Sequence, residues 1–129
     1  AIAAAKRRAR EQGLPLSFRT ADLYQLSAPT DAAELVLCCE VLEHLPDPER
    51  ALERLCTLAR PHLVVSVPRE PLWRVLNVTR GKYWGDFGNT PGHLQHWSQG
   101  SFLALLRRHI EIVELRTPLP WTMALCRVG

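Results

Sequence analysis

The fold of this chain is decided by an apolar run that leads directly into acidic and imidazole side chains, Leu35-Val36-Leu37-Cys38-Cys39-Glu40-Val41-Leu42-Glu43-His44. Five consecutive apolar residues are typical of a strand covered on both faces, as in parallel sheets. Leu63-Val64-Val65-Ser66-Val67, apolar at four of its five positions, predicts a second buried strand. Between the runs, Asp47 is expected to cap a helix with Pro48 at its first position. This order predicts a parallel βαβ unit with a right-handed crossover, and therefore an α/β sheet.

Weaker patterns predict the elements on either side of this unit. Ala1 to Gln12 have a helical composition, closed by Gly13 where a left-handed cap belongs. Apolar residues alternate from Leu16 to Thr20, which predicts a strand that ends at Asp22. Beyond the second apolar run we expect a helix near 73–76, a long loop over 81–97, a helix capped by Ser98, and an antiparallel edge hairpin of strands 110–116 and 121–128.

Composition favours one intracellular domain. The chain has 129 residues, of which 47% are hydrophobic, and a net charge of +3, which requires neither a nucleic-acid nor a membrane partner. The basic run from Lys6 to Arg10 is interpreted as the solvated face of a helix. Four cysteines without a CxxC pair indicate small core residues in a reducing cytosol. No apolar run has the length of a membrane span, so we predict a cytoplasmic protein.

Ionisable side chains follow three successive predicted strands. In open α/β sheets, ligands bind beyond the carboxyl ends of the strands. These positions hold Asp22, then Glu40, Glu43 and His44, and finally Glu70. Neither helix nor strand propensity requires such a concentration of ionisable groups at one edge. The sequence therefore predicts a functional site there.

The chain resembles the class I S-adenosylmethionine-dependent methyltransferases of the type 11 and ubiquinone-methylase kind. The resemblance is carried by Asp22-Leu23, by the EVLEHL-x-DP string from Glu40 to Pro48, and by Val67-Pro68. It implies a three-layer, doubly wound, Rossmann-like and mostly parallel sheet with the antiparallel C-terminal edge hairpin. It also implies the cofactor S-adenosyl-L-methionine and methyl transfer to an O, N or C atom of a small-molecule, sugar or lipid-linked acceptor. The oligomeric state is left open.

The resemblance also assigns cofactor residues. Asp22 would hydrogen-bond the adenine amino group with Leu23 beside the ring, and Glu40 and Val41 would line the cofactor pocket. The family's GxGxG turn, and the acidic residue that holds the ribose, have no counterpart among these residues, and Ala1 already lies in the following helix. We therefore expect residues 1–129 to be a single partial methyltransferase domain, its C-terminal two-thirds, truncated at the N-terminus.

His44 is the candidate catalytic base, with Glu43 as the residue that orients it. Imidazole titrates near neutral pH and suits removal of a proton from an oxygen or nitrogen acceptor. The alternative is a helix-entry histidine bonded to backbone. We predict no metal, although Glu40, Glu43 and His44 have the E-x-x-E-H spacing that holds a divalent metal in small-RNA 2′-O-methyltransferases, with His93 or His96 as a further ligand.

The long loop and the helix before it supply the predicted acceptor site. In the family that the chain resembles, this region covers the active site. The candidates are Trp73, Asn77, Arg80, Tyr83, His93, His96 and Trp97. The alternative is that the aromatic residues only pack a lid, and Trp121 in the last strand is predicted to lie in the core. A second reading of the whole chain is a non-catalytic methyltransferase-like binding or partner module.

Overall fold

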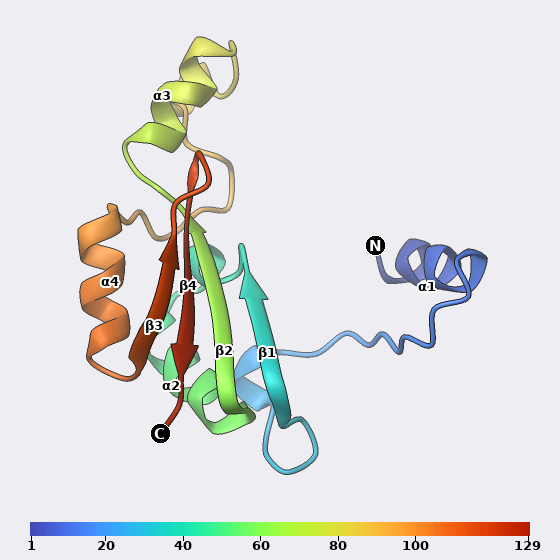
Figure 1. Ribbon diagram of the computed structural model, residues 1–129. Helices are drawn as coiled ribbons and strands as arrows, with labels where there is room; N and C mark the ends of the chain where they lie inside the picture. The colour runs from blue at the N-terminus through green and yellow to red at the C-terminus, as the bar shows by residue number, and fades with distance from the viewer.

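The computed structural model describes all 129 residues (Figure 1). They form a four-stranded mixed sheet, four α-helices and three 3-10 turns. The strands are β1 (Ala33–Cys39), β2 (Ala59–Pro68), β3 (Glu111–Arg116) and β4 (Trp121–Arg127). The helices are α1 (Ile2–Glu11), α2 (Pro48–Leu58), α3 (Leu72–Thr79) and α4 (Gln99–Arg107), and the 3-10 turns are η1 (Leu23–Gln25), η2 (Leu42–His44) and η3 (Trp84–Asp86).

The sheet has the strand order β1-β2-β4-β3. β1 and β2 pair in parallel, with Leu37 opposite Val64, and α2 forms the crossover between them. β4 runs antiparallel to both β2 and β3, so the C-terminal hairpin ends the sheet at β3. The predicted α/β sheet with its βαβ unit and antiparallel edge hairpin is confirmed. The sheet is mixed rather than mostly parallel, since one of its three strand pairs is parallel.

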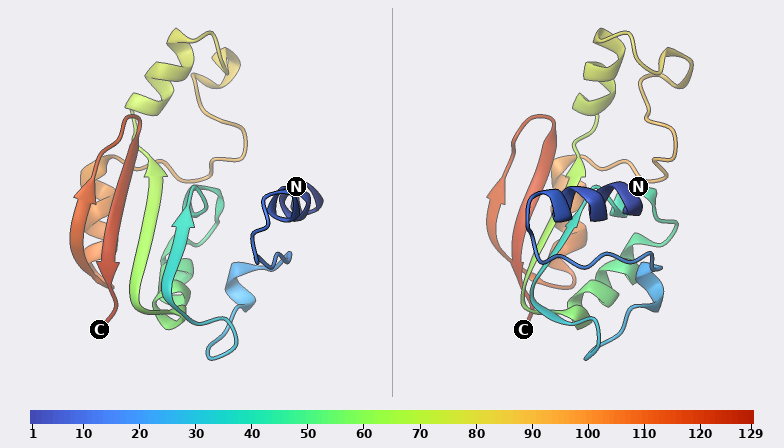
Figure 2. Two further views of the ribbon diagram at one scale, coloured as in Figure 1. Left: turned by 45° about the vertical axis from the view of Figure 1, so that its right-hand side comes forward. Right: turned by 90° about the vertical axis from the view of Figure 1, so that its right-hand side faces the viewer.

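The core lies on one face of the sheet, beneath α2 and α4 (Figure 2). Leu52 of α2 and Phe102 of α4 are fully buried there, against side chains such as Val65 of β2. The opposite face is open at β1, where Leu35 is 52% exposed and Leu37 is 65% exposed. The third layer implied by the resemblance is therefore not packed over β1 within these residues.

Local sequence signals set the start of α2 as predicted. The Asp47 side chain accepts a hydrogen bond from the backbone N–H of Arg50 at 3.0 Å, and Pro48 occupies the first turn. The cap satisfies one of the backbone N–H groups that a helix leaves unpaired at its start. α4 begins in the same way, with Ser98 accepting from the N–H of Ser101.

Loss of the α2 cap is a direct test of this part of the fold. We expect Asp47→Ala to lower the free energy of unfolding by about 1 kcal/mol, because an orphan N–H group loses its partner. Urea unfolding measures the difference. Glu53→Ala is the matched control, since Glu53 lies exposed on the same helix, and it should leave the midpoint unchanged. Equal stability of the Asp47→Ala variant and the wild type would show that the cap is not formed in solution.

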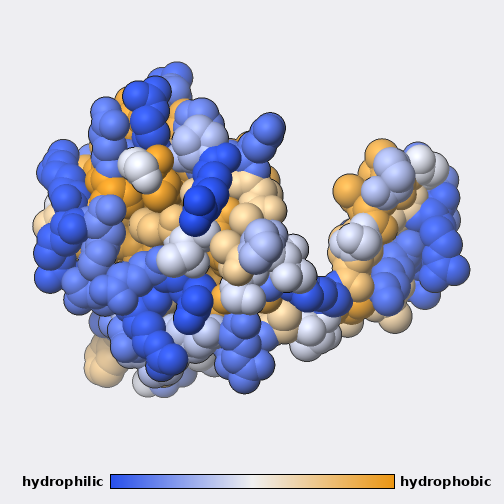
Figure 3. Space-filling model, turned by 90° about the horizontal axis from the view of Figure 1, so that it is seen from below, coloured by the Kyte–Doolittle hydropathy of each residue, from blue (hydrophilic) through white to orange (hydrophobic).

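The N-terminal segment differs from the prediction. α1 ends as predicted, with Gly13 at φ 65°, but the strand predicted from Leu16 to Thr20 is wrong, because residues 14–22 have no regular structure. Strands need a neighbour for their backbone groups, whereas the N–H of Leu16 bonds locally to the carbonyl of Leu14. α1 stands apart from the sheet, with apolar atoms on the side turned toward the rest of the molecule (Figure 3).

Two further predictions are tested by burial and helix length. All four cysteines are free, and Cys38 and Cys126 are buried as predicted. Cys39 is exposed, so its assignment to the core is wrong: it points to the open face of β1. None of the helices is both long enough and apolar enough to cross a membrane.

Candidate active site

A tight turn at the carboxyl end of β1 carries the central residues of the site. Glu40 has a left-handed backbone, φ 58°, and its N–H donates to the carbonyl of Ser66 on β2 at 3.1 Å. The 3-10 turn η2 follows at once, and Leu42 anchors it in the core with no exposed surface. The turn thereby directs Glu43 inward, while His44 stays accessible with 43% of its side chain exposed.

Glu43 is a buried carboxylate without a partner. It is 1% exposed, and neither of its side-chain oxygens accepts a hydrogen bond. Burial raises the pKa of Glu43 to about 7, and the nearby charge of Glu40 acts in the same direction. A carboxyl group whose pKa is raised in this way releases its proton less readily than an exposed one, and a neighbouring cation would stabilise its charged form.

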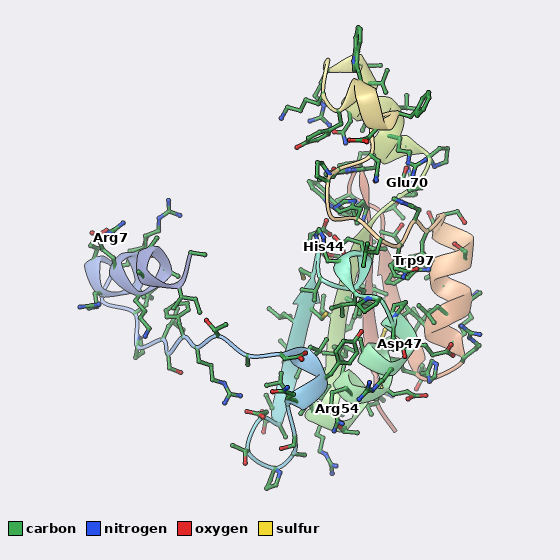
Figure 4. The ribbon with its side chains drawn as sticks, turned by 180° about the vertical axis from the view of Figure 1, so that it is seen from behind. Arg7, His44, Asp47, Arg54, Glu70 and Trp97 are labelled. Atoms are coloured by element: carbon green, nitrogen blue, oxygen red, sulfur yellow. The ribbon has the colours of Figure 1, made fainter.

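His44 is oriented by a backbone carbonyl. Its Nδ1 lies 2.8 Å from the carbonyl oxygen of Gly92. A carbonyl oxygen only accepts, so Nδ1 carries the proton, and the lone pair of the neutral ring is on Nε2. Nε2 lies 4.0 Å from Oε1 of Glu43. This bond to the backbone is the one that the alternative reading of His44 expects, and it gives the ring an orienting partner other than Glu43. Figure 4 shows His44 beyond the end of β1.

The loop after α3 is fastened to this turn. The N–H groups of Leu94 and Gln95 both donate to the carbonyl of Glu43, at 2.7 and 2.9 Å. The side-chain amide of Gln95 donates to the carbonyl of Leu45 at 3.1 Å. These bonds fix the loop against η2, so its histidines are positioned by backbone contacts and not by side-chain packing alone.

Four aromatic side chains follow one another along this edge, and we call them the aromatic row: His44, His93, Trp73 and Trp121. The rings of His44 and His93 meet edge to face with centroids 4.8 Å apart. The ring centroid of Trp73 lies 6.1 Å from that of His93 and 6.1 Å from that of Trp121. Burial lowers the pKa of His93, with the neighbouring His44 adding to the effect. His93 is therefore a neutral ring at pH 7. Trp121 is only partly buried, so its assignment to the core needs correction.

Two predicted acceptor residues hold the loop in place. The amide of Asn77, which is 4% exposed, donates to the carbonyl of Gly88 at 2.8 Å. The indole N–H of Trp73 donates to the hydroxyl of Thr90 at 2.9 Å. Because both polar groups are used within the segment, Asn77 has a structural role here, and Trp73 offers only its ring face to the site.

Removal of the Asn77 amide tests this role. We expect Asn77→Ala to destabilise the α3-loop segment by about 1 to 3 kcal/mol, since it leaves the buried Gly88 carbonyl without a donor. Amide hydrogen exchange over residues 88–90 should become faster. Lys82→Ala, at an exposed position of the same segment, is the control. Unchanged exchange in the Asn77 variant would contradict the assignment.

The other predicted acceptor residues have partners other than His44. His96 lies 3.6 Å from Glu70, and Trp97 packs on Phe102 of α4 with ring centroids 5.6 Å apart. Figure 4 labels Trp97 beside α4 and Glu70 near the start of α3. Arg80 bonds back to its own helix through the carbonyl of Leu76, and Tyr83 is exposed before η3. The last two lie on the segment that projects beyond the sheet (Figure 1).

The predicted cofactor residues are also separated. The Asp22 side chain caps η1 by accepting from the N–H of Tyr24 at 3.0 Å. Tyr24 donates its hydroxyl to the carbonyl of Asp47 at 2.9 Å, so η1, with Leu23, is tied to the start of α2. Val41, in contrast, lies at the edge next to the turn and is 36% exposed.

Glu43, His44 and His93 meet a geometric condition for metal ligation. Each offers one ligand atom, and these atoms lie within 4.8 Å of one another. A carboxylate with two imidazoles suits a divalent transition metal. The set differs from the E-x-x-E-H set considered from the sequence, because the Glu40 carboxylate oxygens are bound by Ser66 and Trp121.

Comparison with known proteins agrees with the geometry of this edge. The family model described as a methyltransferase domain matches residues 1–65, half of the chain. The chain belongs to the methyltransferase domain family. It is 32% identical over 60 residues to the ubiquinone biosynthesis O-methyltransferase of Coxiella burnetii (strain Dugway 5J108-111). The aligned stretch covers 46% of this chain and 26% of that protein. It is also 31% identical over 87 residues to the protein of the same name from Aeromonas salmonicida (strain A449). Here the aligned stretch covers 64% of this chain and 36% of that protein.

Solved structures show the same fold. The magnesium protoporphyrin IX methyltransferase of Synechocystis PCC 6803, crystallised with SAH, superposes with a TM-score of 0.71 at 19% identity, covering 99% of this chain and 59% of that one. A SAM-dependent methyltransferase from Aquifex aeolicus gives a TM-score of 0.69 at 12% identity, and the match covers 99% of this chain and 63% of that one. The predicted Rossmann-like fold class is thereby confirmed. The chain spans only about a quarter to a third of the curated relatives that it matches.

Proposed function

We propose that this chain forms the acceptor side of an S-adenosylmethionine-dependent methyltransferase, which methylates an oxygen of a hydroxylated aromatic ring. The observation that carries the proposal is the position of His44, whose Nδ1 is bonded to the Gly92 carbonyl, so that Nε2 faces the site at the end of the aromatic row. Family membership supports the methyl transfer, and the names of the two ubiquinone O-methyltransferases support an oxygen acceptor.

The residues at this edge fit the cofactor. S-adenosylmethionine supplies a methyl group on a positively charged sulfur. The buried carboxylate of Glu43 has two oxygens without partners, so a neighbouring cation would satisfy it electrostatically. Val41 presents an exposed apolar side chain two residues after Cys39, where the open face of β1 ends. We assign Val41 and Glu43 to the cofactor side of the site.

His44 removes the acceptor proton in the proposed reaction. As the acceptor oxygen takes the methyl group, Nε2 accepts its proton, and the Nδ1–H bond to Gly92 stabilises the resulting imidazolium. A positioned base contributes about 10²- to 10⁴-fold to the rate. Most of the remaining rate comes from alignment of the acceptor with the methyl group, worth up to roughly 7 to 11 kcal/mol.

The aromatic row gives the acceptor a flat binding surface. The ring faces of Trp73 and His93 lie beside the base, and their polar groups are already engaged or neutral. Aromatic faces favour stacked or edge-to-face contact with another ring. A hydroxylated ring would thus present its hydroxyl to His44 while its face contacts the row.

A transfer assay with a catechol tests the proposal. The intact protein is incubated with methyl-labelled S-adenosylmethionine and 3,4-dihydroxybenzoate, and labelled methoxy product is measured. The control acceptor is 3,4-dimethoxybenzoate, which has the same ring but no free hydroxyl on it. We expect label in the first product and none in the second. Absence of label with the catechol, in protein that binds the cofactor, would refute the acceptor class; equal labelling of both would refute a ring hydroxyl as the target.

A second candidate role for the same cluster is divalent cation binding by Glu43, His44 and His93. It is favoured by the 4.8 Å grouping of their ligand atoms together with the two unpartnered oxygens of Glu43. Calorimetric titration with Mn²⁺ or Zn²⁺ alone distinguishes the roles. One bound ion that is lost in His93→Ala would establish the metal site. No saturable binding would leave His44 as a metal-free base.

A further inference from the structure

We propose that Glu40 is a positioning residue, whose carboxylate joins the ends of β1, β2 and β4 and so fixes both η2 and the aromatic row. The catalytic meaning of this role rests on the proposed function. The resemblance to known methyltransferases instead implies direct contact between Glu40 and the cofactor. The contacts of its two oxygens, its backbone conformation and its link to His44 each favour the positioning role.

Both oxygens of Glu40 are already in use. Oε1 accepts from the hydroxyl of Ser66 at 3.0 Å, and Oε2 accepts from the indole N–H of Trp121 at 3.0 Å. Ser66 lies on β2 and is 3% exposed, and Trp121 is the first residue of β4. The backbone N–H of Glu40 also donates to the carbonyl of Ser66. We call these contacts of Glu40 with Ser66 and Trp121 the Glu40 joint. Hydrogen bonds to a charged group are stronger than neutral ones, so the joint resists displacement.

The backbone at Glu40 indicates that the side chain holds the turn. A φ of 58° is unusual for a residue other than glycine and is retained where the surroundings enforce it. Glycine would adopt this conformation freely, yet it could not make either side-chain bond. Ser66 and Trp121 are the contacts that can hold Glu40 in this form.

The joint reaches His44 by two routes. Along the chain, Glu40 begins the turn that ends at His44. Through space, Trp121 is the far member of the aromatic row, in which Trp73 and then His93 lead back to His44. Loss of the joint should therefore move His93 and His44 even though neither touches Glu40. A purely local stabilising role would leave the environments of both rings unchanged.

Four variants separate the possibilities. Glu40→Gln keeps both bonds, because its amide oxygen accepts from Trp121 and its N–H donates to Ser66. Glu40→Gly keeps the backbone conformation but loses the joint. Trp121→Phe and Ser66→Ala each remove one bond without touching Glu40. Glu34→Gly, at an exposed position of β1, is the control for placing glycine on this strand.

The test records the ring NMR signals of His44 and His93 in protein free of cofactor and acceptor, so its outcome is independent of methyl transfer. We expect both sets of signals to shift in Glu40→Gly and Trp121→Phe, and to stay at wild-type positions in Glu40→Gln and Glu34→Gly. If Glu40→Gly does not fold, Trp121→Phe and Ser66→Ala provide the same test. Wild-type signals in the variants that lose a bond would overturn the proposal.

Cofactor titration separates positioning from direct contact. A positioning role predicts that Glu40→Gln binds S-adenosylmethionine within about twofold of wild type, and that Trp121→Phe lowers turnover about tenfold or more through misalignment. A large loss of cofactor affinity in Glu40→Gln, with wild-type affinity in Trp121→Phe, would make Glu40 a direct ligand and overturn the proposal. Where no transfer is measured with any variant, the histidine signals still decide the question.

Discussion

Replacing His44 with alanine should lower the turnover of methyl transfer about 10²- to 10⁴-fold, the usual contribution of a positioned general base. The loss should appear mainly in kcat, because the proton is removed only as the acceptor oxygen reacts. Cofactor affinity should stay close to wild type, since His44 is assigned to the acceptor side. The expected pattern is therefore a low kcat with a nearly unchanged dissociation constant for S-adenosylmethionine.

Initial rates with 3,4-dihydroxybenzoate, together with calorimetry, measure the two quantities separately. His62→Ala is the matched control, because His62 lies on β2 outside the site. His93→Ala should have a smaller effect than His44→Ala, since it removes a packing partner of the base and not the base itself. An unchanged turnover in His44→Ala would reject the catalytic role and leave the bond to the Gly92 carbonyl as a purely structural contact of His44.

The second large effect is a dependence of stability on pH that comes from Glu43. Its pKa is about 7 in the folded protein, against an ordinary value of 4.5. The folded state thus binds this proton more tightly than the unfolded chain. Its contribution to stability is complete below about pH 4.5 and is lost as the pH rises through 7. The difference corresponds to about 3 kcal/mol.

Urea unfolding between pH 4.5 and 8, in buffer with a chelator, measures this effect. Glu43→Gln should remove the dependence on pH and be the more stable protein at pH 8, because an amide never ionises in the buried position. Glu34→Gln, where the same change is made at an exposed position of β1, should keep the wild-type profile. A wild-type profile in Glu43→Gln would show that the carboxyl group is solvated in solution.

Elements with local signals were predictable from the sequence. The apolar runs of β1 and β2, with Asp47 and Pro48 between them, determine the βαβ unit through short-range rules on burial and capping. The strand predicted from Leu16 to Thr20 is absent. Alternation of apolar and polar residues over so short a stretch also occurs in loops, and a strand forms only where a distant segment pairs with it. Tertiary context therefore decides such segments.

The site was predictable only in part for the same reason. The position of Glu43 and His44 after a buried strand identified the edge, because ligand sites of α/β sheets gather there. The orienting group of His44, however, is the carbonyl of Gly92, and every residue has a carbonyl. Nothing in the sequence around Trp121 indicated a polar contact either, yet its indole N–H donates to Glu40, which is distant in the chain. Such contacts become visible only once the loop and the last strand are placed.

Saturable binding of the cofactor to the intact protein is the most direct test of the central claim. Titration with labelled S-adenosylmethionine, in competition with S-adenosylhomocysteine, is predicted to give a single saturable site that the second compound occupies competitively. Absence of saturable binding at millimolar cofactor would contradict the account. The chain would then be a methyltransferase fold that serves as a binding or partner module.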